Sequence, residues 1–333
     1  MGGVLRQRGR VKAVWSTTTR GATAGLGAAA LFGLSAPIGK RLVAHLDPQL
    51  LAGLLYAGAA LGFWLIRALR GSSVEEAPLR RADFAAVVGV ALLGGIAGPV
   101  LLLVGLARVT GVAGSLLLNL EAPATMILAA AMFHEHVGRR VAIAAACIVS
   151  GAAVLGFRPG EHALDAIGVG AITLACLAWG FANNLTRKLS LKDPFAIVRM
   201  KATSAAIANV GVASARGVGW PAAGMLGVIL LVGLASYGVS VLLDAYALRL
   251  VGAAREAAYF ATAPFVGALA AIILFREKLG SADLAAMASM ILGVVLLARE
   301  KHAHGHTHED LEHEHTHAHD DHHQHQHLSL IHI

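Results

Sequence analysis

Residues 111–135 read GVAGSLLLNLEAPATMILAAAMFHE, and residues 252–277 read GAAREAAYFATAPFVGALAAIILFRE, so one stretch of sequence occurs twice in this chain. Both copies begin with Gly, carry Ala-Pro near the middle and end with Phe, one variable residue and Glu. A second match pairs Phe32-Gly33…Lys40-Arg41-Leu42 with Trp179-Gly180…Arg187-Lys188-Leu189. The chain is therefore a duplicated unit of roughly 140 residues, and a repeat on this scale decides the fold.

Composition indicates that the duplicated unit belongs in a bilayer. Apolar residues make up 56% of the 333 residues, charged residues make up 14%, and the mean hydropathy is +0.66. A membrane-spanning helix needs about 20 mostly apolar residues. Polar clusters divide the chain into ten candidate spans, five in each repeat: Ala22–Gly39, Leu50–Ile66, Phe84–Leu106, Gly111–Met132, Val141–Phe157, Ala166–Leu185, Phe195–Ala213, Pro221–Leu248, Ala253–Phe275 and Ala282–Leu297.

The odd number of spans in each repeat has a geometric consequence. The second copy enters the membrane from the opposite side, so a pseudo-two-fold axis in the membrane plane relates the halves. With a cytoplasmic N-terminus, the inside segments carry 20 Lys and Arg and the outside segments carry 7. The positive-inside rule then predicts a multi-pass protein of the cytoplasmic membrane with both termini in the cytoplasm. Contact with anionic lipid explains the net charge of +7 without a nucleic-acid partner.

These features predict an all-α membrane protein of ten transmembrane helices, arranged as two inverted five-helix repeats. The expected organisation is a basic cytoplasmic segment at 1–21, a first repeat at 22–157, a second repeat at 166–298 and a disordered His-rich cytoplasmic tail at 299–333.

The repeated motifs resemble the EamA-type branch of the drug/metabolite transporter superfamily. The resemblance rests on the aromatic-Gly…Lys/Arg pattern that ends the first span of each half, and on the Ala-Pro and terminal Glu of the fourth, and it covers about 22–300. It implies a secondary transporter of ten helices that moves small metabolites, often outward, by alternating access. It does not imply a particular substrate.

Pro123 and Pro264 lie inside long apolar segments, where each proline removes a backbone hydrogen bond and kinks its helix. Such breaks are tolerated in membranes where protein or a watery cavity satisfies the freed groups. The paired kinks suggest paired gates, and the alternative is a bend that merely fits helices together.

Glu121 is the strongest candidate for the transport cavity. It lies halfway along its span, two residues before Pro123 and two after Asn119. A charged group at the centre of a bilayer is costly, so it usually faces a cavity or a partner. Glu121, Asn119 and the kink are therefore expected to line a substrate or proton site, and the alternative is a packing Glu paired permanently with a basic side chain. Its repeat mate is Thr262.

Further polar residues within the spans complete the predicted cavity. Asp244 is expected to pair with Lys201 or Arg199, as a gate or as a packing contact. Asn183 and Asn184 follow the Trp179-Gly180 motif, and adjacent residues point to different helix faces, so one of the two amides is expected to face the substrate. Tyr259 and Thr262 lie three residues apart on one face of the ninth span and form either a polar wall or core.

The C-terminal tail carries twelve His and six carboxylates within 302–327. Imidazole suits Zn, Ni, Cu and Co, and with so few apolar residues the tail cannot form a core of its own. The pattern predicts chelation of Ni, Zn or Co, although no cofactor is required for transport; an expression tag would be an uninterrupted run. The final segment 328–333 fits neither pattern. The proposed ligands are His302, His304, His306, His308, His313, His315, His317, His319, His322, His323, His325 and His327.

Three functions fit this sequence. The first is a transporter, expected to be an exporter, of small metabolites or drugs; the second is a divalent-metal exporter for Ni, Co or Zn, and the third is a membrane-anchored metal sensor. Candidate metal ligands are sparse within the spans, which favours organic cargo. The chain contains no Gly-Lys-Ser/Thr phosphate loop and no G-x-G-x-x-G after a strand, so we expect no enzyme and no ATP-driven step.

Overall fold

The computed structural model describes residues 17–70, 80–134, 137–157, 164–189 and 194–299, and every element in these ranges is helical. The first repeat contains α1 Thr17–Gly33, α2 Ser35–Val43, α3 Pro48–Arg70, η1 Arg81–Asp83, α4 Phe84–Gly89, η2 Val90–Ala97, α5 Gly98–Arg108, α6 Gly111–Leu117, η3 Leu118–Leu120, α7 Glu121–Phe133 and α8 Arg139–Gly156. The second contains α9 Ala166–Arg187, α10 Pro194–Ala215, α11 Ala223–Gly233, η5 Leu234–Val239, α12 Ser240–Val251, α13 Ala253–Phe260, α14 Ala263–Phe275 and α15 Ser281–Ala298.

Nine helical segments of the described chain are long and apolar enough to cross a membrane. They correspond to nine of the ten predicted spans. The predicted seventh span forms α10, a helix of 22 residues, but it is not among the nine. It carries Arg199 and Lys201, which lower its apolar content. That α10 also crosses the membrane, which would make ten spans, remains a prediction.

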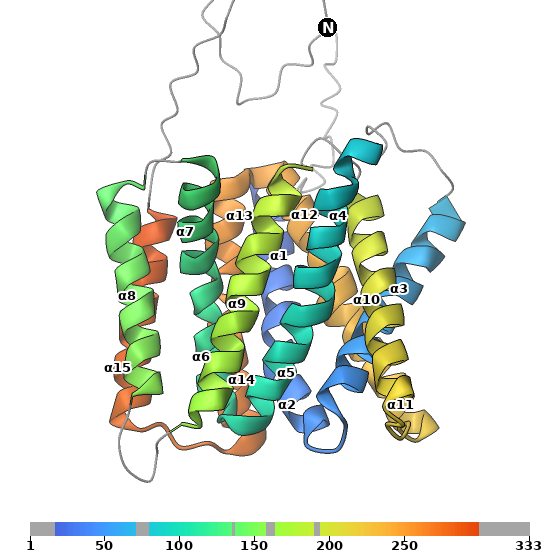
Figure 1. The fold of residues 1–333 in the computed structure, drawn as a ribbon. Helices are drawn as coiled ribbons and strands as arrows, with labels where there is room; N and C mark the ends of the chain where they lie inside the picture. The colour runs from blue at the N-terminus through green and yellow to red at the C-terminus, as the bar shows by residue number, and fades with distance from the viewer. Residues whose placement is uncertain (1–16, 71–79, 135–136, 158–163, 190–193, 300–333) are drawn as a thin grey trace, which may run out of the picture. The chain divides into compact units, whose positions relative to one another are not determined.

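The two repeats pack through matched pairs of helices. The most extensive contacts in the molecule join α8 with α15, α3 with α10, α1 with α12, α5 with α9, and α6 with α14. Each pair combines one element from each repeat. Exchanging the repeats maps the α3–α10 and α8–α15 pairs onto themselves and turns the α1–α12 pair into the α9–α5 pair, as a pseudo-two-fold relation requires. The α6–α14 pair corresponds instead to α13 with α7. Figure 1 shows α8 beside α15 at one edge, with α3, α10 and α11 at the opposite edge.

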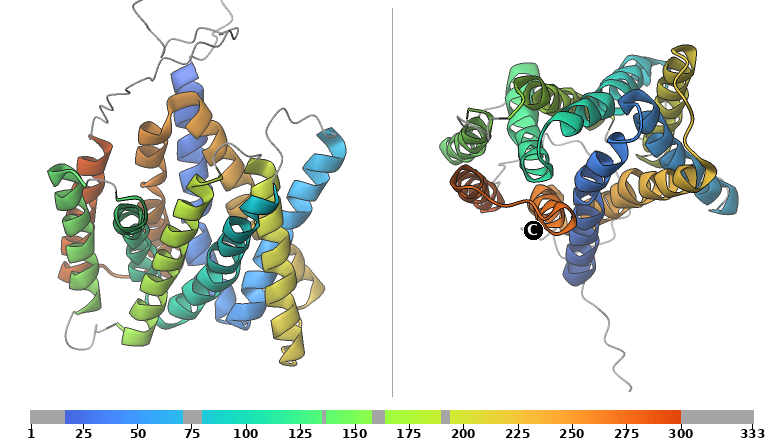
Figure 2. Two further views of the ribbon diagram at one scale, coloured as in Figure 1. Left: turned by 45° about the horizontal axis from the view of Figure 1, so that its top comes forward. Right: turned by 90° about the horizontal axis from the view of Figure 1, so that it is seen from below.

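Several spans are interrupted near their middle. In the third span of each repeat the α-helix opens into a π-helical segment, η2 in the first and η5 in the second. Such segments in otherwise regular helices frequently occur at functional sites. The fourth span of each repeat also breaks, between α6 and α7 at η3, and between α13 and α14 at Ala261–Thr262. Figure 2 shows the same helical bundle tilted forward and seen from below.

The predicted proline kinks are therefore displaced toward the N-terminus by two or three residues. Pro123 lies in the first turn of α7 and Pro264 lies at the start of α14. In the first turn of a helix the backbone N–H has no intrahelical acceptor, so proline begins these helices without losing a hydrogen bond. The chain departs from α-helical geometry just before each proline, at Leu118–Leu120 and at Ala261–Thr262.

Candidate functional site

Glu121 lies at the break in the fourth span, as the first residue of α7. Asn183 of α9 donates a hydrogen bond from Nδ2 to Oε1 of Glu121 over 2.9 Å. Lys201 of α10 lies within electrostatic range of the same carboxylate. Glu121 and Lys201 are half-buried and Asn183 is exposed, so these groups are not sealed in the core. The structure thus brings together a carboxylate from one repeat with an amide and an amine from the other.

The other two predicted amides have different environments. Asn119 is buried, and its Nδ2 donates to the Leu116 carbonyl at 3.0 Å and approaches Sδ of Met290 at 3.7 Å. It therefore stabilises η3 and the contact with α15 rather than sharing a site with Glu121. Asn184 is also buried and donates to the carbonyl oxygens of Thr125 and Gly180 at 2.9 and 2.8 Å. Of the adjacent pair, Asn183 is the one that reaches Glu121.

Asp244 does not have the partner that the sequence suggested. Its carboxyl group is hydrogen-bonded to that of Glu256 on α13, and its Oδ1 is buried without a hydrogen-bond partner among the described residues. Lys201 lies toward Glu121, and the Arg199 guanidinium lies over the Trp64 ring at 4.9 Å from its centre. The predicted pairing with Lys201 or Arg199 was wrong, because the packing of α12 on α13 brings Glu256 to Asp244.

Tyr259 and Thr262 lie on either side of the second helix break. The Thr262 hydroxyl donates to the carbonyl of Tyr259 at 2.7 Å, and the Thr262 N–H donates to the same carbonyl at 3.1 Å, so both groups stabilise the turn at the break. The Tyr259 ring packs on Gly25 of α1, where an added Cβ would approach it to 3.0 Å. Tyr259 therefore contributes to helix packing, and Thr262 occupies the position matching Glu121.

The structure reveals an aromatic cluster that sequence reasoning missed. The Phe32 ring contacts the rings of Trp179, Tyr237 and Phe260, with centres 6.5, 6.2 and 5.2 Å away. Tyr56 extends the cluster, with its ring centre 5.2 Å from that of Tyr237. The available signal was the repeated aromatic-Gly motif, because Phe32 and Trp179 are its two aromatic members.

The π-helical segment and the aromatic cluster satisfy each other's polar groups. The Tyr56 hydroxyl and the Trp179 Nε1–H each donate to the Gly94 carbonyl over 3.1 Å. Gly94 lies in the π-helical segment η2, where its carbonyl is available to accept these hydrogen bonds. Buried phenol and indole groups need such a hydrogen-bond acceptor. The cluster is therefore fixed in place by the same irregular segment that interrupts the third span.

The glycines of the aromatic-Gly motif allow the repeats to approach each other. A Cβ on Gly33 would overlap the carbonyl oxygen of Ala263, and a Cβ on Gly180 would lie 2.8 Å from the Thr125 nitrogen. Ala263 and Thr125 lie at the starts of α14 and α7. The aromatic-Gly motif of each repeat thus packs on the broken helix of the other repeat, which explains why both motifs recur together.

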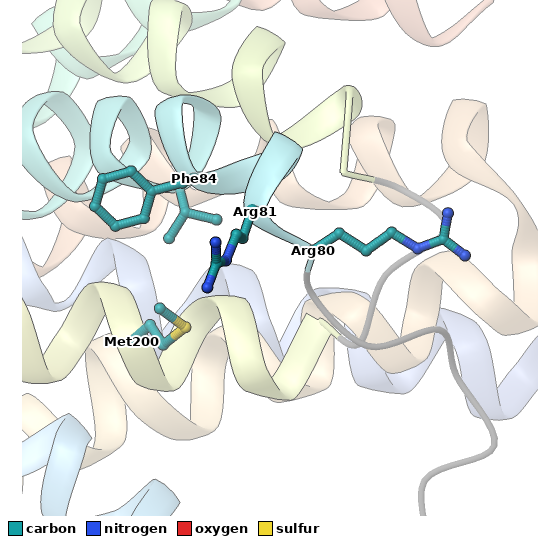
Figure 3. A pocket seen from close by; sticks show the side chains of 5 residues that line it. Arg80, Arg81, Phe84 and Met200 are labelled. Carbon is teal, nitrogen blue, oxygen red and sulfur yellow. The ribbon is translucent and has the colours of Figure 1, made fainter.

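A pocket of about 450 Å³ lies away from Glu121, between the start of the third span and α10. Figure 3 shows Arg81, Phe84 and Met200 around it, with Arg80 directed away. Val87 completes the lining. Sequence reasoning had not singled out these residues, since an Arg pair at a membrane edge is ordinary.

The structure does not test the predicted metal site. The twelve His residues of the tail lie outside the described residues. Within the described part, no group of three or more His, Cys, Asp or Glu side chains is placed to hold a metal ion.

The model of the EamA-like transporter family matches this sequence twice, at 19–157 and at 166–299. The chain belongs to the EamA-like transporter family. No curated protein matches the sequence. One solved structure, described as "Crystal structure of protein", resembles this fold with a TM-score of 0.61 at 14% identity, over 85% of this chain and 98% of that one. At this identity the resemblance shows the fold alone. The family description is that of transporters, which agrees with the multi-pass membrane architecture.

Proposed function

We propose that this EamA-family protein exports small organic metabolites or drugs across the cytoplasmic membrane by alternating access, with Glu121 in its transport site. The observation that carries the proposal is the position of Glu121 at a broken helix, hydrogen-bonded to Asn183 and in range of Lys201. In many secondary transporters, discontinuous helices contributed by both repeats form the substrate and ion sites. The same arrangement here supports a site that both repeats form and that relative motion can remodel.

The proposed cargo is organic because the described spans offer hydrogen-bonding and aromatic groups. Glu121, Asn183 and Lys201 provide charge and polarity, while the aromatic cluster around Phe32 provides apolar surface. Soluble metabolites typically present both kinds of group, and binding sites for them combine apolar walls with a few polar anchors. An ion or substrate gradient drives transport in this proposal, with a proton on Glu121 as the candidate coupling ion.

The Glu121→Gln variant tests the assignment. Gln keeps the size and one acceptor for Asn183 but removes the charge facing Lys201. Hydrogen bonds to charged groups contribute about 1.5–3 kcal/mol, so we expect export to fall by roughly tenfold or more. Export is measured as accumulation and resistance in cells overexpressing the chain, against a panel of amino acids and drugs, at several external pH values.

Asp283→Asn is the matched control for Glu121→Gln. Asp283 accepts a hydrogen bond from the Gly280 N–H at the start of α15, so this variant also neutralises one carboxylate, but far from the site. We expect export by the control to match the parent. Normal export by correctly inserted Glu121→Gln protein contradicts the site assignment, and failure of that variant to insert supports a packing role instead.

Divalent-metal export is the second candidate function, and the His content of 302–327 is the observation that favours it. In this alternative the tail captures Ni, Co or Zn in the cytoplasm before export. Including salts of these metals and of Cu in the same panel separates the two functions. A metal response with no organic response would support the second candidate.

A further inference from the structure

The two ends of the helical unit are packed differently, although the repeats are matched. We call the end that contains the C-termini of α5 and α14 and the N-terminus of α6 the Glu277 end; it lies at the bottom of Figure 1. At this end α6 and α14 pack extensively on each other, and α2 packs on both. These three elements are half-length pieces of broken spans from both repeats.

The counterparts of these pieces at the opposite end do not pack in the same way. Exchanging the repeats converts α6 and α14 into α13 and α7, and converts α2 into the C-terminal half of α9. The α9 helix packs on α7, but within the described residues α13 makes little contact with either. Because matched repeats would make both ends alike in a symmetric state, the structure is closed at the Glu277 end and less closed at the other.

A carboxylate from the second repeat joins the two repeats at the closed end. Oε1 and Oε2 of Glu277 accept hydrogen bonds from the Gly111 and Val112 N–H groups, over 2.7 and 2.8 Å. These amides begin α6, where backbone N–H groups have no intrahelical acceptor and the helix dipole favours an anion. Two charge-assisted hydrogen bonds therefore join the repeats, between residues that are 166 and 165 positions apart in the sequence.

Lys40 supports this contact from α2. Its Nζ donates to the carbonyls of Leu106 and Val109, at 3.1 and 2.5 Å, and its charge interacts with that of Glu277. Lys40 thereby holds the end of α5 and the turn before α6 in position for Glu277. At the matching position of the second repeat, the Arg187 guanidinium lies over the Phe133 ring, at 5.3 Å from its centre.

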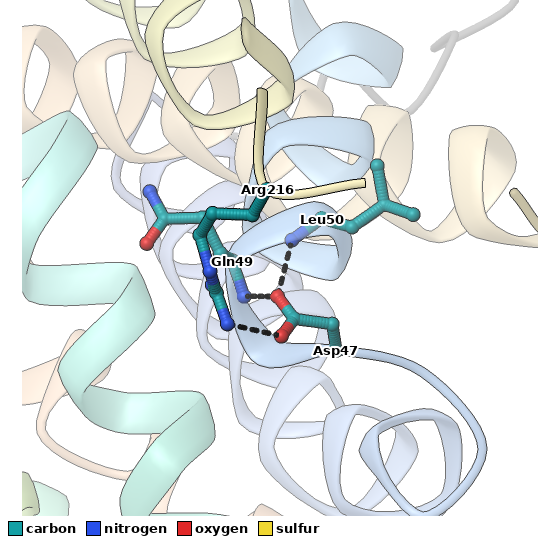
Figure 4. Close-up of polar contacts among 4 residues, drawn as sticks. All are labelled: Asp47, Gln49, Leu50 and Arg216. Carbon is teal, nitrogen blue, oxygen red and sulfur yellow. Dashed lines mark hydrogen bonds and ion pairs between the residues drawn. The ribbon is translucent and has the colours of Figure 1, made fainter. Parts of the chain in front are cut away.

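Two exposed ion pairs also join the repeats at the Glu277 end. Arg216 lies 3.3 Å from Oδ2 of Asp47, whose other oxygen accepts the N–H groups of Gln49 and Leu50 at the start of α3 (Figure 4). Arg108 lies 3.2 Å from Asp165. Both pairs are largely solvent-exposed, so each contributes little to the stability of the contact between the repeats. The Glu277 contact is half-buried and charge-assisted, so we expect it to contribute more than either ion pair to holding the repeats together at this end.

We propose that Glu277, positioned by Lys40, is the latch that holds this end closed and that releases the N-terminus of α6 in every transport cycle. The inference rests on the proposed function, because alternating access requires each closed end to open. The remaining contact between α6 and α14 involves no charged side chain and includes small residues, such as Ser115 against Gly267. The two helices can therefore separate without leaving a buried charge. Basic asymmetry in the sequence predicts that this end faces outside the cell.

Thiol labelling of a buried reporter tests the latch without a substrate. Ser115 is fully buried between α6 and α14, and its hydroxyl has no hydrogen-bond partner among the described residues, so Ser115→Cys is a mild change. The parent is the full chain with Cys147 and Cys176 replaced by Ser. A membrane-impermeant maleimide is added to intact cells and, separately, to everted membrane vesicles. Labelling rates are compared for the reporter alone and with Glu277→Gln, Lys40→Met or Asp283→Asn.

We expect slow labelling in the parent and labelling from the outside that is roughly tenfold faster with Glu277→Gln, because one charge-assisted contact is lost. Lys40→Met should act in the same direction. Asp283→Asn should leave the rate unchanged, since its carboxylate caps a turn of its own repeat at the same end.

Unchanged labelling in both latch variants, with the protein folded and inserted, overturns the proposal. If Glu277→Gln fails to insert, Lys40→Met decides the outcome alone. Accelerated labelling in a protein that exports no compound of the panel retains the latch and contradicts the proposed function. Normal export together with labelling that is not accelerated contradicts the latch and retains the proposed function.

Discussion

Gly58 and Gly233 show how single residues set the distance between α3 and α11. A Cβ on Gly58 would overlap the carbonyl oxygen of Leu230, and a Cβ on Gly233 would overlap that of Leu55. The two contacts are reciprocal, so the backbones themselves touch. Small residues that permit such close approach are a principal source of helix association in membranes, where lipid removes most of the hydrophobic driving force.

Gly233→Ala is therefore expected to destabilise the protein. Overpacking of a close contact costs about 1–3 kcal/mol, and here the obstacle is backbone rather than a flexible side chain. Gly227→Ala on the same helix is the control, because a Cβ there meets nothing within 4 Å and Ala favours the helix by about 0.5–1 kcal/mol. Thermal unfolding of both purified variants in detergent measures the difference. Equal melting temperatures would contradict the close contact.

At the scale of elements, α7 and α14 end in the same unusual way. His134 and Arg276 cap these helices in the left-handed conformation, with φ of 54° and 53°. They occupy matching positions in the repeated motif, directly before Glu135 and Glu277. A left-handed cap reverses the chain after α14, and Glu277 then reaches the start of α6. The variable residue of the motif is thus a helix cap in the left-handed conformation.

Replacing Arg276 tests the cap. Arg276→Gly removes the steric cost of the left-handed conformation and should keep or raise the melting temperature. Arg276→Val should lower it, because a β-branched residue is strained there by about 1–2 kcal/mol. Both variants remove the same charge, so each controls for the other in thermal unfolding. A more stable Val variant would show that the turn relaxes to another conformation.

At the scale of the whole molecule, the helical unit and the tail are expected to serve separate roles. Residues 17–299 contain all the packing described above, whereas the His-rich stretch 302–327 lies outside the described residues. The repeat-to-repeat contacts of the described residues are made within the helical unit, so we predict that the tail can be removed without exposing the core of that unit.

Deleting 302–327 should leave membrane insertion and organic export unchanged, while tight binding of Ni or Zn disappears. Imidazole must be neutral to bind a metal, so the affinity of the full chain should fall as the pH falls through the usual His range. Calorimetric titration of the purified full chain and of the deletion, at neutral and acidic pH, measures both effects. Unchanged metal binding would place the metal site elsewhere, and loss of metal resistance would favour metal export.

The sequence was sufficient to predict the duplication, the helical membrane fold and the family, because these depend on hydropathy and on motif spacing along the chain. It also singled out Glu121 as a candidate, since a lone carboxylate amid apolar residues is visible in the sequence, and the role of Glu121 in transport stays a prediction. The partners of the charged groups could not be predicted. Asn183, Glu256 and the start of α6 reach Glu121, Asp244 and Glu277 through contacts between helices that are far apart in sequence.

The tertiary structure alone decided at which end of the molecule half-helices of the two repeats pack on each other. Both repeats carry the same motifs, so the sequence describes the two ends as equivalent. Packing of α2, α6 and α14 made them different, because two half-helices from opposite repeats meet at one end, while among the described residues their counterparts α13 and α7 make little contact. The π-helical segments and helix breaks likewise lie where Phe32-Gly33 and Trp179-Gly180 contact the opposite repeat, and these contacts join positions that are far apart in sequence.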